Sequence, residues 1–288
     1  MAFLDRTTGA EFIPELWAGA IFKFYKETNR LSGSVDDYSA LVKGAGDTVH
    51  IPKIALKAPV EKASSVIVDF STAATQTKVD LSIDKHYVVP ELFEDIALIQ
   101  SSSDLMSKYT KMMGESIARQ VESDMWVELD GFNTRVDVNA NNSCDAATLE
   151  SILANLYAID VDPSNCSFVV SNLVLADIMH PSSGVGQYFI RRDASGEGQG
   201  LRTGSVGLIY GMEVFHSAAI PTATTDNLAV GAVYPKDAAV FAAQQGVRVQ
   251  SQYDIAYLGT KVTADIIYGM KLLDESTDKR GLNIVNLG

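Results

Sequence analysis

The side chains of this sequence that most readily carry chemistry are four histidines and two cysteines, and they are widely separated. They are His50, His86, His180, His216, Cys144 and Cys166. Protein zinc sites usually draw ligands from short spacings such as C-x-x-C or H-x-x-x-H. Neither spacing occurs in the sequence. We therefore predict no metal centre and no cofactor.

Asp47 and His50 are close enough in sequence to act as a general base and its orienting carboxylate. A hydrolase of that kind also needs a nucleophile, yet the sequence has no G-x-S-x-G motif and no matched Cys and His. The residues around His50 alternate between apolar and polar, which favours a polar residue on the exposed face of a ribbon. We therefore predict no catalytic residues and no enzymatic activity.

Glycines at positions 196, 198 and 200 could suggest a phosphate-binding loop. No strand directly precedes them, no Gly-Lys-Ser/Thr follows, and Glu197 would repel a phosphate. A flexible loop is the better interpretation. Arg191 and Arg192 in the same region are either a solvated pair or a contact with another molecule.

Four acidic residues gather at the end of a predicted long helix. They are Glu122, Asp124, Glu128 and Asp130. Acidic side chains at a helix C-terminus oppose the helix dipole. Two explanations remain open, namely a solvated face or a surface that meets Lys and Arg side chains of adjacent copies.

Composition limits the function further. The chain has 288 residues, 47% apolar content and a net charge of −13. Such acidity argues against a dedicated nucleic-acid binder, because neutralising phosphates requires an excess of cations. No apolar run is long enough to span a membrane, and residues 1–6 do not look like a signal peptide. Two cysteines suit a reducing cytoplasm. We expect a chain made inside a cell and soluble there.

The elements that would position these residues are a long ribbon and a long helix. Residues 77–89 alternate as a half-buried strand, about 40 Å long at 3.3 Å per residue. Its expected partner is 46–60, and a break at Pro90-Glu91 separates it from a helix over 104–129. The stripe of that helix runs from Leu105 through Met112 and Met113 to Leu129. A two-stranded ribbon is marginally stable alone, so we expect it to lie on another copy of the chain.

The remaining segments complete an α+β order of helix, ribbon, helix and a mixed lobe. A first helix begins near Pro14 and carries Trp17 as a docking aromatic residue. Residues 66–70 are an apolar stretch near the far end of the hairpin. Asp145 is expected to cap a helix. Short strands are expected over 208–210, 212–215, 228–233, 239–242 and 247–250, with a last strand over 261–273.

Several stretches together resemble major capsid proteins of tailed bacteriophages with the HK97 fold. They are Phe12–Trp17, Gly46–Pro52, Leu81–Tyr87, Asp104–Tyr109 and Gly207–Ser217 with the following Ile220-Pro221. They cover most of the chain in the order expected for that family. No single stretch is specific, and the resemblance rests on their combination.

The resemblance implies a fold and a layout. Residues 1–46 would be the N-terminal arm and 47–89 the extended loop. Residues 90–144 and 256–288 would form the peripheral domain with its spine helix, and 145–255 the axial domain. Candidate subunit-interface residues are Trp17, Val49, Ile51, Pro52, Val66, Val68, Phe70, Glu128, Arg191 and Arg192.

The resemblance also implies a function. The chain would be a homo-oligomer of pentamers and hexamers that encloses double-stranded DNA in an icosahedral shell, without sequence-specific binding and without a membrane. Scaffold, portal and decoration proteins are the expected partners, and the virion, assembled in the host cytoplasm, is the expected location. The acidic composition suggests a shell lining that does not hold phosphates. The alternatives are a tail-tube or other oligomeric virion protein, or a cytoplasmic two-lobed hydrolase.

Overall fold

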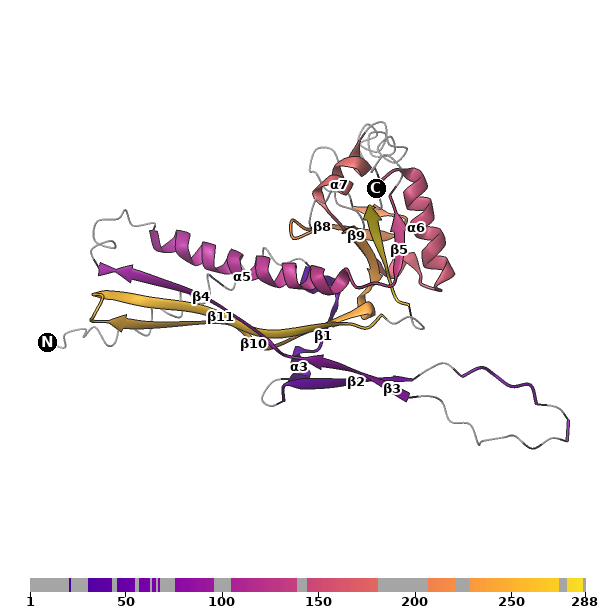
Figure 1. Ribbon diagram of the computed structural model, residues 1–288, viewed down its shortest axis with the longest axis horizontal. Coiled ribbons are helices and arrows are strands. Elements are labelled where there is room, and N and C mark those ends of the chain that lie inside the picture. Colours follow the sequence, from indigo (N-terminus) through magenta and orange to yellow (C-terminus); the bar gives the residue numbers. More distant parts are fainter. Residues whose placement is uncertain are drawn as a thin grey trace.

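Two sheets and one long helix form the body of the molecule, and a hairpin projects from it (Figure 1). The computed structural model describes residue 21 and the ranges 31–42, 46–54, 57–62, 64–65, 67, 76–95, 105–138, 144–180, 207–220, 228–274 and 279–286. The first helix expected near Pro14 lies outside these residues, apart from the buried Ile21.

A four-stranded sheet carries the long helix on one face. Its strands, in spatial order, are β1 (Asp36–Asp37), β10 (Ala239–Asp254), β11 (Gly259–Leu272) and β4 (Lys85–Glu94). Helix α5 (Leu105–Leu129) confirms the helix predicted over 104–129. Its buried side, which includes Met113, Ile117 and Val121, packs against β11 side chains such as Ile266 and Tyr268. This apolar stripe, at helical spacing, fixes α5 along the sheet.

A six-stranded sheet forms the second lobe. Its strands, in spatial order, are β5 (Thr134–Asp137), β12 (Leu282–Asn286), β9 (Leu228–Pro235), β6 (Cys166–Val170), β8 (Met212–His216) and β7 (Leu208–Ile209). Helices α6 (Ala146–Ala158) and α7 (Asn172–Met179) share a core with Phe168 and Val170. The intervening Val169 belongs to the core under α5, so both faces of β6 are buried. Asp145 caps α6 as predicted, accepting a hydrogen bond from the Thr148 amide at 3.0 Å.

Four short helical elements lie between the main elements of the described chain. They are the 3-10 helices η1 (Leu31–Ser34), η2 (Pro163–Asn165) and η3 (Lys236–Ala238), and the one-turn helix α3 (Ser39–Val42). In the part of the chain that the structure describes, no helix is long and apolar enough to cross a membrane.

The hairpin is rooted on the four-stranded sheet and then leaves it. Strands β2 (Thr48–Ile54) and β3 (Gln76–Ser82) pair antiparallel. A small core of Val42, Ile51, Leu81, Val240, Ala242 and Leu273 holds the root. The segment between the strands, described at 57–62, 64–65 and 67, extends away from both sheets (Figure 1). The predicted partner of the alternating strand is thus confirmed for the root.

The prediction of a single long strand over 77–89 is wrong, because two strands share this range. The chain leaves β3 after Ser82 and enters β4 at Lys85, in a different sheet. At the crossing, the Ile83 amide donates to the Asp47 carbonyl at 2.8 Å. The alternation continues across this crossing because both strands have one buried face, so the sequence pattern does not reveal the change of sheet.

The break predicted at Pro90-Glu91 is also wrong. Pro90 lies inside β4, opposite Thr263 of β11. Because β4 is an edge strand, a residue without an amide hydrogen is tolerated there.

Three smaller predictions are corrected. Residues 239–250 form one strand, β10, with register shifts near Gln245 instead of a break. Strand β12 follows the one predicted to be last. Met112 belongs to the predicted apolar stripe of α5 but is 38% exposed, since it lies on the side away from the sheet.

The two sheets do not follow the expected division of the chain. Strand β10 lies within 145–255 but pairs with β11 of the four-stranded sheet. Strands β5 and β12 lie within 90–144 and 256–288 but belong to the six-stranded sheet. The division into two sheets is set by strand pairing between distant segments. The order of the elements along the chain does not reveal this pairing.

A close approach between β3 and β11 requires glycine at position 269. A Cβ atom there would lie 2.1 Å from the Ser82 carbonyl oxygen. We predict that Gly269→Ala lowers the free energy of unfolding by about 1–3 kcal/mol, the usual cost of overpacking. Urea unfolding followed by circular dichroism measures the change. Gly246→Ala is the control, because nothing lies within 4 Å of a Cβ atom there. Equal stability of the two variants would contradict the close approach.

Candidate functional site

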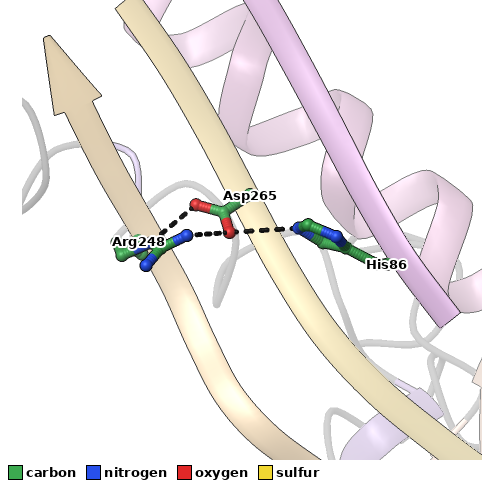
Figure 2. A network of polar contacts seen from close by, with 3 residues as sticks. All are labelled: His86, Arg248 and Asp265. Atoms are coloured by element: carbon green, nitrogen blue, oxygen red, sulfur yellow. Dashed lines mark hydrogen bonds and ion pairs between the residues drawn. The ribbon is translucent and has the colours of Figure 1, made fainter. Parts of the chain in front are cut away.

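The most connected polar cluster with a histidine joins three strands of the four-stranded sheet. Figure 2 shows Asp265 of β11 between Arg248 of β10 and His86 of β4. The Arg248 guanidinium donates two hydrogen bonds to the Asp265 carboxylate, at 3.0 and 2.7 Å. The Nε2 atom of His86 lies 3.2 Å from the same carboxylate. The cluster therefore cross-links neighbouring strands.

The electrostatics of this cluster are those of a structural ion pair. The Asp265 side chain is 6% exposed, whereas that of Arg248 is 46% exposed. Burial alone would raise the pKa of Asp265, but the hydrogen bonds from Arg248 and His86 outweigh it and hold the pKa of this carboxyl below its ordinary value. The three side chains contain no hydroxyl or thiol that could act as a nucleophile. The cluster stabilises the sheet and does not form a catalytic site.

His50 does not pair with Asp47, in keeping with the rejection of that pair from the sequence. The Nδ1 atom of His50 lies 2.5 Å from the carboxylate of Asp80, which is directly opposite on β3. The hydrogen bond from His50 and the neighbouring Lys78 hold the pKa of Asp80 below its usual range. The His50 and Asp80 side chains are 61% and 44% exposed. The exposed-ribbon interpretation of His50 is confirmed.

Two of the four acidic residues at the end of α5 are buried and have hydrogen-bond partners within the subunit. Asp124 is buried and accepts from the Tyr268 hydroxyl at 2.9 Å and from Lys85 Nζ at 3.1 Å. Glu122 is buried and accepts from the Ser217 hydroxyl at 3.2 Å. Both explanations left open by the sequence are therefore wrong for these two residues. The partners of Glu122 and Asp124 lie about 40 to 145 positions away in the chain, so a local sequence pattern could not predict them.

The last two acidic residues of α5 differ from this pair. Glu128 is half-buried. Burial raises the pKa of Asp130, although Arg135 lies 3.7 Å away.

The two cysteines are inert in the folded chain. Cys144 and Cys166 are buried free thiols. Burial, with nearby carboxylates, raises the pKa of each to about 12, so neither is a thiolate at neutral pH. Among the residues that the structure describes, no group of three His, Cys, Asp or Glu side chains could hold a metal ion.

A shallow trough lies on the face of the four-stranded sheet opposite α5. Its lining includes Pro90, Leu92, Gln250, Lys261 and Thr263. Lys261 pairs with Asp254 at the turn between β10 and β11, and the described lining residues include no histidine or cysteine. Among these described residues no nucleophile lies next to a base, so the trough does not support the hydrolase alternative.

Four of the ten sequence-predicted interface residues can be located. Ile51 is 8% exposed within the core at the root of the hairpin, and Val49 packs partly against that core. Pro52 is exposed and Glu128 is half-buried. Trp17, Val66, Val68, Phe70, Arg191 and Arg192 lie outside the described residues, as do the glycines at 196–200.

Exposed apolar residues are found at two projections, the first of which includes part of the predicted 66–70 stretch. On the loop between β2 and β3, Val60 is 86% exposed and Ile67 is 92% exposed. At the tip between β10 and β11, Ile255, Tyr257 and Leu258 are 78%, 58% and 61% exposed. Sequence reasoning missed the tip, although the apolar run Ile-Ala-Tyr-Leu between two strands was a usable signal.

The β10–β11 tip is held in a defined shape. The Ala256 amide donates to the Asp254 carboxylate at 2.9 Å, and the other oxygen of Asp254 pairs with Lys261 at 2.5 Å. Lys261 Nζ also lies 4.9 Å from the centre of the Tyr257 ring. An ordered loop that displays apolar side chains is suited to contact with another molecule.

Solved capsid structures resemble the chain over most of its length. A chain of Mycobacterium phage Che8 is 21% identical with a TM-score of 0.70, covering 89% of this chain and 90% of that chain. The capsid of the native GTA particle is 12% identical with a TM-score of 0.69 and 91% coverage of each chain. The capsid of Ralstonia phage GP4 is 11% identical with a TM-score of 0.68, covering 88% and 87%. No family model and no curated protein matches the sequence. The likeness confirms the α+β, HK97-like capsid fold.

The Asp265 cluster predicts a pH-dependent loss of stability. Asp265→Asn should lower the free energy of unfolding by about 1–3 kcal/mol at pH 7; the loss is limited because water can still solvate the half-exposed Arg248. The folded pKa of Asp265 lies below its unfolded value of about 3.9. Its stabilisation is therefore complete above that value and is lost as the pH falls through the folded pKa. Urea unfolding between pH 7 and pH 3 should show the difference between wild type and variant shrinking.

Asp254→Asn is the matched control for this experiment. It removes an ion-paired carboxylate from the β10–β11 tip, where water can replace the ion pair. We expect it to cost less than Asp265→Asn. Equal losses, or a loss for Asp265→Asn that does not vary down to pH 3, would show that the buried cluster is not a stabilising ion pair.

Proposed function

We propose that the chain is a major capsid protein, which self-assembles into the icosahedral shell that encloses the double-stranded DNA of a tailed bacteriophage. The observation that carries the proposal is the likeness to phage capsid structures over about nine-tenths of the chain. A second observation supports the proposal, because the hairpin presents apolar side chains away from its own subunit.

The hairpin gains stability by lying on a second copy. Val60 and Ile67 are almost fully exposed in the single chain, and Ile54 at the end of β2 is 69% exposed. Burying one such side chain contributes about 1.5–3 kcal/mol. A few of these contacts at each subunit are individually weak but are repeated throughout a shell. The sequence-predicted Pro52, Val66, Val68 and Phe70 belong to the same proposed surface.

The β10–β11 tip supplies a second proposed contact. It lies at the end of the four-stranded sheet far from the six-stranded sheet, and its apolar residues face solvent (Figure 1). A copy that uses different patches to bind its two neighbours makes heterologous contacts, which form rings when the rotation closes. Pentameric and hexameric rings of this kind would build the shell. Trp17, Glu128, Arg191 and Arg192 remain proposed contacts between copies.

The domain layout follows the sheets in this proposal. Residues 1–46 are the N-terminal arm and 47–82 the extended loop. The peripheral domain comprises β4, α5, β10 and β11, and the axial domain comprises the six-stranded sheet with α6 and α7. This assignment moves β10 out of the axial domain and β5 and β12 into it, relative to the division expected from the sequence.

The proposed role also fixes partners and location. The chain would act in the virion, after assembly in the host cytoplasm, with scaffold, portal and decoration proteins as partners. It would enclose DNA without reading its sequence and would act as a structural protein, not as an enzyme. The polar clusters described above support this, because each one links elements of the subunit.

Replacing residues 55–75 by Asn-Gly tests the clamping role of the hairpin. The replacement joins Ile54 to Gln76, which are directly opposite in the ladder, by a two-residue turn suited to hairpins. The root core stays intact, so we expect a soluble subunit whose melting temperature changes little. We expect no stable shells in electron micrographs, whereas the wild-type chain should form closed particles of megadalton mass.

A matched control replaces only the exposed Lys57 and Lys62 by Gln, which retains the full length of the hairpin loop. Shells should still form. Normal shells from the shortened chain would contradict the clamping role. Wild-type tubes or stacked rings would favour a tail-tube protein, and a small oligomer would contradict the shell altogether.

A further inference from the structure

The exposed side of α5 is cationic although the chain as a whole is strongly acidic. Lys108, Lys111 and Arg119 are exposed, and Glu115 is the acidic residue among them. At 100° per residue, these four positions fall within an arc of about 80° and span about 16 Å of the helix. This group, called the α5 stripe below, has a net charge of +2 on a chain of net charge −13.

Two of the three cations of the α5 stripe have no ion-pair partner among the described residues. Lys111 lies 3.6 Å from Glu115, which is half-buried and one helical turn away. Within the described ranges, no carboxylate lies at ion-pair distance from Lys108 or Arg119. Arg248, on a different element of the same lobe, is instead neutralised by a bidentate contact with its carboxylate.

Among the residues that the structure describes, no other element covers the α5 stripe. Further along the same side of α5, Glu122 and Trp126 are buried where the helix meets the second lobe. The first half of α5 runs along the four-stranded sheet away from that lobe (Figure 1). The hairpin lies on the opposite face of the sheet, because Gly269 contacts Ser82 while the adjacent Tyr268 packs under α5. The α5 stripe and the clamping hairpin therefore belong to opposite sides of the subunit.

We propose that the α5 stripe contacts the phosphates of double-stranded DNA, so that this side of α5 faces the interior of the shell. The inference rests on the proposed capsid function. It differs from the acidic lining that the composition suggests, since the charge of this face is opposite to that of the chain. The contact would be independent of sequence, because cations on phosphates position a duplex without reading its bases.

The shape of the α5 stripe favours DNA over a protein partner. The stripe is a straight, convex row on a 25-residue helix, and among the described residues the exposed apolar side chain next to it is Met112. A protein partner is usually held by apolar or aromatic anchors that enter pockets. A duplex needs only cations placed along a rod, each of which releases a counterion. Repetition of the stripe in every subunit would compensate for its weakness.

Cross-linking inside particles tests the proposal most directly. DNA-filled particles are treated with formaldehyde and digested with nuclease and protease, and lysine–nucleotide adducts are identified by mass spectrometry. We expect adducts at Lys108 and Lys111, and none at Lys57 or Lys62 of the hairpin. Adducts confined to the hairpin lysines, or adducts to a co-assembled acidic protein in place of nucleotides, would overturn the assignment of this face to DNA.

A salt titration of full-length subunits released from particles provides a second test, with a fluorescent 24-base-pair duplex as probe. Two to three neutralised phosphates give a slope of log K against log salt of about −1.8 to −2.7, or a loss of about 12- to 40-fold between 25 and 100 mM salt. In the variant K108Q/K111Q/R119Q the slope should approach zero. The control K236Q/K271Q/K279Q removes three exposed lysines elsewhere and should keep the wild-type slope.

The two proposals fail in different ways. If the wild-type chain forms no closed particles, the capsid function itself is wrong. If closed, DNA-filled particles form but the stripe lysines give no adducts, only the DNA contact is wrong. Equal slopes for the stripe variant and the control variant, or no duplex binding by wild type at 25 mM salt, would also refute the contact.

Discussion

The hairpin between β2 and β3 is held at its root and exposes apolar side chains beyond it, and this constraint governs the rest of the molecule. A two-stranded ribbon has no second layer that could cover its apolar face. In the described part of the loop, Val60 and Ile67 remain exposed in the single chain. In the proposed shell, these side chains would be buried on another copy. Assembly would then stabilise the subunit.

The body of the subunit is built to hold that hairpin in a fixed direction. The root core includes side chains from α3, both hairpin strands and β10. Gly269 lets β3 pass directly over β11, and Asp265 links β10 and β11 with β4 on the same side. On the other side, Asp124 joins α5 to β11 and β4. In the proposed shell, a rigid root would set the position of the hairpin on the neighbouring subunit. The polar clusters at the root would then have a mechanical role.

The sequence predicted the elements with strong local signals. The period of α5 and the cap at Asp145 are local properties, and both were predicted correctly. The division between β3 and β4 was not, since an alternating pattern continues when a strand moves from one sheet to another. The partners of His50, Asp124 and Asp265 were also beyond prediction, because each depends on pairing between segments far apart in the chain. The exposed tip at Ile255–Leu258 had a local signal that was overlooked.

The exposed side chains of the hairpin loop need contacts that a single chain cannot supply. A cryo-electron microscopy reconstruction of assembled wild-type particles tests this requirement directly. The account predicts that Val60 and Ile67 lie within about 4.5 Å of apolar atoms of another copy, the distance of a packed contact. Finding both side chains exposed to solvent, or folded back onto their own subunit, would contradict it.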